Sequence, residues 1–153
     1  MKEGNRPVHI LMADDDEDDR RSVAKAWKLS RAANGISFVN DGEDLMDYLY
    51  HRGKYSAPAE SPRPGLILLD LNMPKKDGRE ALREIKADAE LRQIPVVVLT
   101  TSKAEEDIYR TYDLGASSFI TKPVTFTSLV ELIHVIGKYW IEIVELPDGR
   151  NGG

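Results

Sequence analysis

The chain has 153 residues, which is enough for one domain that buries a substantial hydrophobic core. It contains no cysteine, so disulfides and thiolate metal sites are excluded. The net charge of −5 argues against a basic nucleic-acid-binding face, and no apolar stretch approaches the ~20 residues that a membrane helix needs. Residues 1–7 lack the apolar segment of a signal peptide, so we expect a flexible tail and a cytoplasmic location.

An apolar run at residues 8–13 (VHILMA) is typical of a buried strand, and an acidic run at residues 14–19 follows it directly. Acidic runs are usually solvated. Here a helical apolar pattern begins near Arg20, so Asp16 or a neighbour can cap this helix, and the acids that follow suit the dipole of its first turn. That interpretation leaves Asp14 and Asp15 at the end of the strand.

A second strand and helix are predicted at residues 36–39 and 45–49, joined by a turn. The next segment, residues 53–65, is polar and contains three prolines. We expect a long surface loop there, which is either a tolerated insertion or a mobile segment that contacts a partner.

Residues 66–69 (LILL) are four apolar residues that end at Asp70. This pattern predicts a strand buried on both faces, and the residue after it emerges at the carboxyl end of the sheet, where open α/β folds bind ligands. Pro74 and Gly78 then define an exposed loop before a helix. Asp70 is therefore a candidate phosphoryl acceptor, although an Asp in this place can also simply cap the next turn.

Two further strands are predicted in the last third of the chain, at residues 94–99 and 117–121. Thr100 ends the first of them, and residues 102–105 (SKAE) fit a capping box that begins a helix. The dipeptide Lys122–Pro123 follows the second, and a final helix begins near residues 125–127.

A strand–helix unit repeated five times predicts an α/β fold with a parallel sheet and helices on both faces. The carboxyl ends of parallel strands share one edge, which brings together Asp14, Asp15, Asp70, Thr100 and Lys122. Neighbouring carboxylates repel one another and favour a cation. A set of oxygen ligands suits Mg²⁺ before Ca²⁺.

In this predicted magnesium site, Asp15 and Asp70 bind the ion directly, Asp14 acts through a water molecule, and Asn72 supplies its backbone carbonyl. An ionised carboxylate is also a nucleophile toward phosphorus, so Asp70 can form an aspartyl phosphate without a general base. Lys122 would pair with one phosphoryl oxygen and Thr100 would donate to another. Taken singly, Lys122 could instead be a solvated lysine and Thr100 a hydroxyl that bonds its own backbone.

The chain resembles the response-regulator receiver domains of two-component signalling over residues 8 to 140. The matching pieces are the acid pair after the first strand, the segment LLDLNMPKKDG with the acceptor, VVVLTTS, and FITKP. The resemblance implies a doubly wound, flavodoxin-like (βα)5 fold with five parallel strands in the order 2-1-3-4-5. It also implies phosphotransfer from a sensor histidine kinase, no enzymatic activity beyond the domain's own phosphorylation and dephosphorylation, and a cis peptide at Lys122–Pro123.

The resemblance further implies a switch. Thr100 moves toward the phosphoryl group, Phe119 turns inward behind it, and the surface formed by the last strand and its flanking helices signals to a partner. Thr101 departs from the family, which usually has a small residue there, and we expect it to slow access to the phosphoryl group.

The end of the chain carries more apolar residues than one packing face of a helix needs. The final helix and the residues to 146 either fold back on the domain, which then spans 8–146, or form a self-association surface. Residues 147–153 are expected to be a frayed tail with no output domain. This pattern resembles the small response regulators paired with bacterial phytochrome histidine kinases, which implies a homodimer through the last helix and tail.

Two other functions fit parts of the sequence. A phosphatase with an aspartate nucleophile usually has a second acid two residues later, but Asn72 stands there. A receiver-like module that only binds partners, without phosphorylation, is the other alternative, but the acceptor and the lysine are both present. The three histidines, His9, His51 and His134, have no acidic or hydroxyl partner at an obvious spacing, so none is expected to be a phosphorelay donor.

Overall fold

The computed structural model describes residues 8–29, 35–101 and 105–143. A five-stranded parallel sheet forms its centre, in the order β2-β1-β3-β4-β5. The predicted doubly wound fold and strand order are therefore confirmed. The strands are β1 (Ile10–Ala13), β2 (Ile36–Val39), β3 (Leu66–Leu69), β4 (Val96–Thr100) and β5 (Ser118–Thr121).

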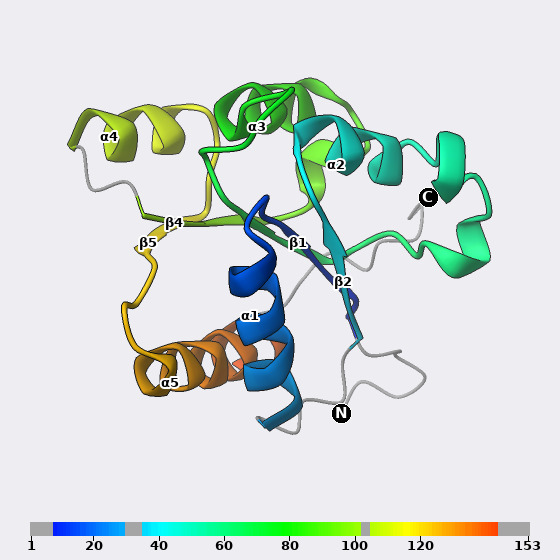
Figure 1. Cartoon of the computed structure of the whole chain (residues 1–153). Helices are drawn as coiled ribbons and strands as arrows, with labels where there is room; N and C mark the ends of the chain where they lie inside the picture. Colours follow the sequence, from blue (N-terminus) through cyan, green and yellow to red (C-terminus); the bar gives the residue numbers. More distant parts are fainter. Residues whose placement is uncertain (1–7, 30–34, 102–104, 144–153) are drawn as a thin grey trace.

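Within the described residues, five α-helices cover the two faces of the sheet (Figure 1). One face carries α2, α3 and α4, and the other carries α1 and α5. Their bounds are α1 (Glu17–Leu29), α2 (Gly42–Leu49), α3 (Gly78–Ala87), α4 (Glu105–Asp113) and α5 (Phe126–Ile136). A π-helical segment, Gly137–Ile143, continues α5, and three short 3-10 turns lie at Gly53–Tyr55, Pro58–Glu60 and Leu91–Gln93.

The sheet separates two hydrophobic clusters. Alternate strand residues point to opposite faces, so Leu11 and Leu69 join the cluster beneath α2 and α3, whereas Met12 and Leu68 join the cluster beneath α1 and α5. Both faces of β1, β3 and β4 are buried. This explains why those strands are continuously apolar in the sequence.

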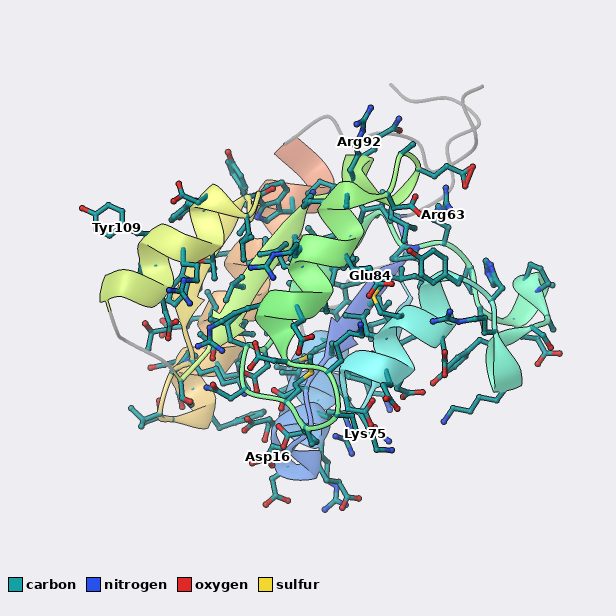
Figure 2. The ribbon with its side chains drawn as sticks, turned by 90° about the horizontal axis from the view of Figure 1, so that it is seen from above. Asp16, Arg63, Lys75, Glu84, Arg92 and Tyr109 are labelled. Carbon is teal, nitrogen blue, oxygen red and sulfur yellow. The ribbon has the colours of Figure 1, made fainter. Side chains whose placement is uncertain are left out.

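The strand register brings the strand ends together at one edge. Ala13 pairs with Leu69, Leu69 pairs with Val98, and Thr100 pairs with Thr121. Seen from above, Asp16 after β1 and Lys75 after β3 lie at the same end of the molecule, and Arg63 and Arg92 lie at the other end (Figure 2). The residues that follow the strands therefore share one end of the sheet.

The segment at residues 53–65 runs mostly over the surface, contains two 3-10 turns and is tied to α2 by hydrogen bonds. The Tyr48 hydroxyl donates to the carbonyl of Pro62 at 2.9 Å, and the Tyr55 hydroxyl donates to Asp44 at 2.8 Å. His9 has no hydroxyl partner at an obvious sequence spacing, but the fold supplies one, since its Nε2 lies 2.8 Å from the Ser37 hydroxyl. Strand pairing of β1 with β2 makes this contact, which sequence spacing does not reveal.

The last helix, α5, packs against α1 and the sheet, and part of its apolar surface is exposed to solvent. Ile133 and Ile136 are buried, and Leu129, Val130 and Trp140 pack against the same cluster. Val135 and Tyr139 are 58% and 50% exposed.

Several expectations concern residues that lie outside the described part of the chain. These are the tail at 1–7, the end of the first helix at 30–34, the capping residues 102–104, and the terminal segment 144–153. Within the described residues, no helix is both long enough and apolar enough to cross a membrane.

Candidate functional site

Two acids of the run at residues 14–19 lie at the end of β1, and the other acids lie at the start of α1. The carboxylate of Asp16 accepts the backbone N–H groups of Asp18 and Asp19 at 2.8 and 3.2 Å, so Asp16 caps α1 as predicted. Asp14 is fully buried, whereas Asp15 is exposed. The helix therefore uses the later acids of the run and leaves this pair at the edge of the sheet.

Asp70 follows β3 and is 5% exposed. Its backbone N–H donates to the carbonyl of Ala13, which fixes the end of β3 beside the end of β1. The loop after it returns closely: a Cβ added to Gly78 would lie 2.3 Å from the carbonyl oxygen of Asp70. Only glycine permits this approach, so α3 begins directly against the backbone of the candidate acceptor.

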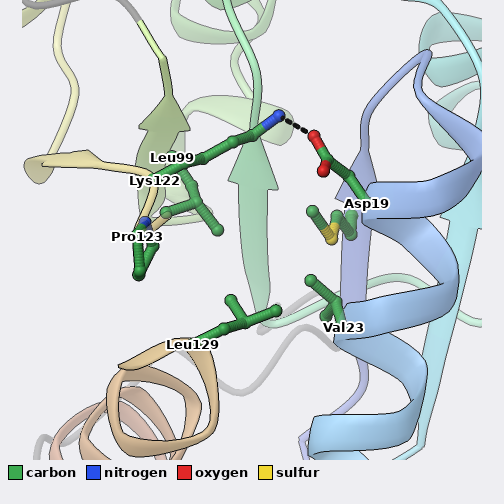
Figure 3. Close-up of a pocket in the computed structure, with 7 residues that line it drawn as sticks. Asp19, Val23, Leu99, Lys122, Pro123 and Leu129 are labelled. Carbon is green, nitrogen blue, oxygen red and sulfur yellow. Dashed lines mark hydrogen bonds and ion pairs between the residues drawn. The ribbon is translucent and has the colours of Figure 1, made fainter. Parts of the chain in front are cut away.

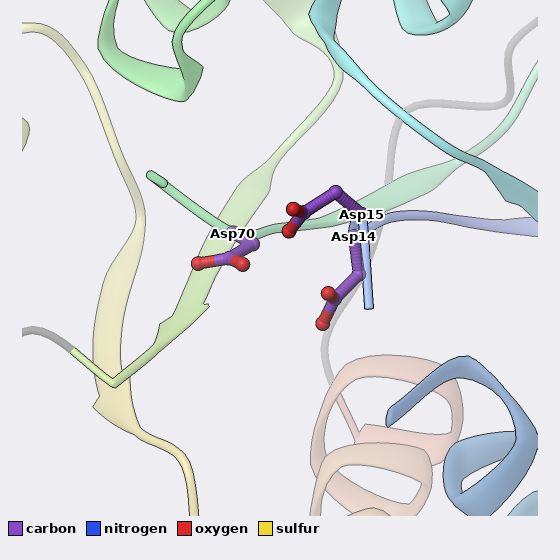
Figure 4. Close-up of side chains that lie close together, drawn as sticks. All are labelled: Asp14, Asp15 and Asp70. Carbon is purple, nitrogen blue, oxygen red and sulfur yellow. The ribbon is translucent and has the colours of Figure 1, made fainter. Parts of the chain in front are cut away.

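Three carboxylates converge at this edge (Figure 4). Asp14, Asp15 and Asp70 each place one oxygen within 4.8 Å of the others. The Oδ2 atom of Asp14 is buried, and apart from its contact with Lys122 it has no hydrogen-bond donor among the described residues. Burial raises the pKa of Asp14, Lys122 opposes this change, and the charge of Asp70 adds to it. This arrangement fits a divalent metal ion bound by oxygen ligands.

Thr100 and Lys122 both reach Asp70, as predicted from the strand ends. The Thr100 hydroxyl is fully buried and donates to Oδ1 of Asp70 at 2.8 Å. The Lys122 ammonium lies 3.4 Å from Oδ2 of Asp70 and 2.6 Å from Oδ2 of Asp14. Burial disfavours its charge, but the hydrogen bonds that the ammonium donates to Asp14 and Asp19 outweigh burial and raise the pKa of Lys122. The lysine therefore stays cationic at the acidic cluster.

One residue at this site was missed by the sequence analysis. Asp19, in the first turn of α1, lies 2.7 Å from Nζ of Lys122. The ion pair lines one end of a small pocket between α1 and α5, which Val23, Leu99 and Leu129 also line (Figure 3). The helix cap and the helix dipole already accounted for the acids of this run, so no signal singled out Asp19.

The remaining predicted residues are placed as follows. Phe119, on β5, is partly buried and packs against the cluster on the α2–α3 face. The backbone N–H of Asn72 donates to Asp70 at 3.3 Å, and the metal-binding role of its carbonyl stays a prediction.

The implied cis peptide at Lys122–Pro123 was wrong, since the described residues contain no cis peptide bond. The trans isomer is the intrinsically favoured one even before proline.

Comparison with known proteins identifies the family. The response regulator receiver domain matches residues 10–134. The chain belongs to the response regulator receiver family. The receiver is 43% identical to the response regulator Rcp1 of Synechocystis sp. over 145 residues, which cover 95% of this chain and 97% of Rcp1.

Two solved structures resemble this receiver closely. The Mn²⁺-bound form of Rcp1 has a TM-score of 0.84 and 42% identity, covering 92% of this chain and 99% of that one. The phosphorylated cyanobacterial phytochrome response regulator RcpA has a TM-score of 0.86 and 41% identity, covering 93% and 99%. Receiver domains bind a divalent metal at an aspartate cluster, and this receiver contains such a cluster.

Proposed function

We propose that this receiver accepts a phosphoryl group from a sensor histidine kinase onto Asp70, in a Mg²⁺-dependent reaction. The observation that supports this function is the convergence of a hydroxyl and an ammonium on one carboxylate. Thr100 and Lys122 both contact Asp70, and they lie at the carboxyl ends of two other strands, Thr100 as the last residue of β4 and Lys122 directly after β5. The similarity to a phosphorylated relative adds support.

The chemistry needs positioning and charge neutralisation more than it needs proton transfer. An ionised carboxylate oxygen of Asp70 forms a bond to phosphorus while the P–N bond of the donor phosphohistidine breaks. The electron pair of that bond stays with the imidazole, which takes a proton from solvent. Lys122 then pairs with one phosphoryl oxygen, and the Thr100 hydroxyl turns from Asp70 to another.

The metal in this proposal is Mg²⁺, held by Asp15 and Asp70 directly, by Asp14 through water, and by the carbonyl of Asn72. Bound there, it would neutralise negative charge on the phosphoryl oxygens. The hard oxygen ligands and the lack of any cysteine favour Mg²⁺ over softer metals.

Phosphorylation is proposed to switch the surface formed by α4, β5 and α5. The added charge of about −1.5 to −2 favours the state in which Thr100 and Lys122 contact the phosphoryl group. Phe119 then turns inward behind Thr100, and the changed surface signals to a partner. In the structure, the Thr100 hydroxyl donates to Asp70.

The partners proposed here follow from similarity and from exposed surface. Rcp1 and RcpA are response regulators, and RcpA is a phytochrome response regulator, so a kinase of the phytochrome type is the proposed donor, in the cytoplasm. The exposed Val135 and Tyr139 support a homodimer through the last helix and tail. Light scattering of the protein before and after phosphorylation tests this dimer, and a monomer in both states would contradict it.

The phosphoacceptor is tested with acetyl phosphate and Mg²⁺, followed by intact-mass measurement. Wild type is expected to gain the mass of one phosphoryl group, and Asp70→Asn is expected to gain none. Asp113→Asn, at an exposed acid that ends α4, is the control for loss of one carboxylate. Equal labelling of wild type and Asp70→Asn would refute the assignment.

A further inference from the structure

The Lys122 ammonium has a third carboxylate partner with no role in the chemistry described above. Its Nζ lies 2.6 Å from Asp14, 2.7 Å from Asp19 and 3.4 Å from Asp70. Asp14 belongs to the metal cluster and Asp70 is the proposed acceptor. Asp19 is outside that cluster, and its side chain reaches Lys122 from α1 rather than from the sheet.

We propose that Asp19 is a positioning residue that engages Lys122 in competition with an incoming phosphoryl group and so restrains phosphorylation. This inference rests on the proposed function of Asp70. An ammonium has three N–H donors. Asp14 and Asp19 engage it at short distances, whereas Asp70 lies at the longest of the three. An incoming phosphoryl oxygen must therefore compete with Asp19 for Lys122.

The local structure frees Asp19 for this role. Asp16 already caps α1 by accepting the backbone N–H of Asp19 itself, so the Asp19 carboxylate is not needed as the cap. It is 38% exposed, and Lys122 is only 11% exposed. Asp19 is thus the more solvent-exposed member of the pair.

Electrostatic repulsion restrains phosphorylation as well. Asp14, Asp19 and Asp70 pair with the Lys122 ammonium and Asp15 lies in the same carboxylate cluster, so these four acids outnumber the nearby cations Lys122 and Arg20. A phosphodonor is itself an anion and is repelled by each carboxylate. Removing the charge of Asp19 therefore lowers the repulsion and also removes one of the three carboxylate partners of Lys122.

The test compares Asp19→Asn with Asp18→Asn. Asp18 is the neighbouring exposed acid in the same first turn, so the control removes the same formal charge and the same favourable interaction with the helix dipole. With acetyl phosphate and Mg²⁺, we expect Asp19→Asn to be phosphorylated at least about threefold faster than Asp18→Asn, a change within the range of a partly exposed ion pair. Asp19→Glu retains a carboxylate and is expected to remain near the wild-type rate.

Two further measurements identify the cause. The dissociation constant for Mg²⁺ alone, measured by calorimetry, should agree within about twofold between Asp19→Asn and Asp18→Asn, because Asp19 is not a ligand. Thermal unfolding in chelator verifies that each variant folds. The role of Asp19 is overturned if Asp19→Asn is phosphorylated less than threefold faster than Asp18→Asn, or more slowly. It is also overturned if Asp19→Glu is phosphorylated as fast as Asp19→Asn. If wild type itself gains no phosphoryl group, the proposed function fails instead.

Discussion

At the scale of single residues, the site depends on close approaches that few side chains permit. Gly78 is the strongest case, because α3 begins against the carbonyl oxygen of Asp70. Asp14 is another, since its buried carboxylate relies on Lys122 as its one donor to Oδ2 among the described residues. Such residues couple the stability of the fold to the geometry of the acceptor.

Gly78→Ala is expected to lower the free energy of unfolding by about 1–3 kcal/mol, because the added methyl group overlaps the backbone of Asp70 and Leu71. It should also slow phosphorylation by displacing Asp70. Urea unfolding and the acetyl phosphate assay measure the two effects. Gly137→Ala is the control, since nothing lies within 4 Å of a Cβ there, and Ala should be neutral or stabilising by about 0.5–1 kcal/mol. Equal stability of the two variants would contradict this account.

His9 predicts a pH dependence of stability. Burial lowers the pKa of His9 from its ordinary value of 6.5, because the imidazolium is poorly solvated beside Ser37. Between the lowered pKa and 6.5, the unfolded chain binds more protons than the folded chain, so the free energy of unfolding falls as the pH decreases through this window. His9→Gln should show a smaller fall in urea unfolding between about pH 7.5 and about pH 5.5. If the free energy of unfolding of His9→Gln falls as much as that of wild type, groups other than His9 cause the pH dependence.

At the scale of elements, two side-chain contacts anchor α4 to its neighbours. Arg79 at the start of α3 makes a bidentate ion pair with Asp107, with N–O distances of 3.0 and 2.8 Å. Tyr112 accepts the backbone N–H of Phe119 on β5 at 3.2 Å. The second contact links α4 to the residue that we propose to rearrange on phosphorylation.

Tyr112→Phe removes the acceptor for the N–H of Phe119 and is expected to lower the free energy of unfolding by about 0.5–1.5 kcal/mol. Hydrogen exchange at the Phe119 amide should become faster, because this N–H lies on the edge strand. Tyr109→Phe is the matched control, since Tyr109 is 68% exposed on the same helix. Unchanged exchange at Phe119 in Tyr112→Phe would show that the contact does not hold β5.

The sequence predicted most of this architecture because its signals were local. The strands β1, β3 and β4 are short apolar runs, and parallel pairing then places Asp14, Asp70 and Thr100 at one edge. Asp19 and the α4 contacts could not be predicted in this way. These contacts depend on how each helix docks on the sheet. The docking decides which side chain of a helical turn faces Lys122 or β5.

At the scale of the whole molecule, metal binding should stabilise the fold. An ion that binds only the folded chain adds about 2.7 kcal/mol at a hundred times its dissociation constant. For a chain of this size we expect Tm to rise by about 5–10 °C with Mg²⁺, and chelator should reverse the rise. Asp15→Asn is the informative variant, because Asp15 is exposed and belongs to the carboxylate cluster. A full rise in Asp15→Asn would exclude Asp15 as a ligand.

The division of the core by the sheet has a spectroscopic consequence. Both tryptophans of the chain, Trp27 and Trp140, pack in the cluster beneath α1 and α5, whereas Tyr48, Tyr50 and Tyr55 lie with the opposite cluster. Indole emission therefore senses only one layer of the protein. Unfolding followed by tryptophan fluorescence and by far-UV circular dichroism will coincide only if the two layers melt together, so this pair of probes tests the cooperativity of the receiver without any label.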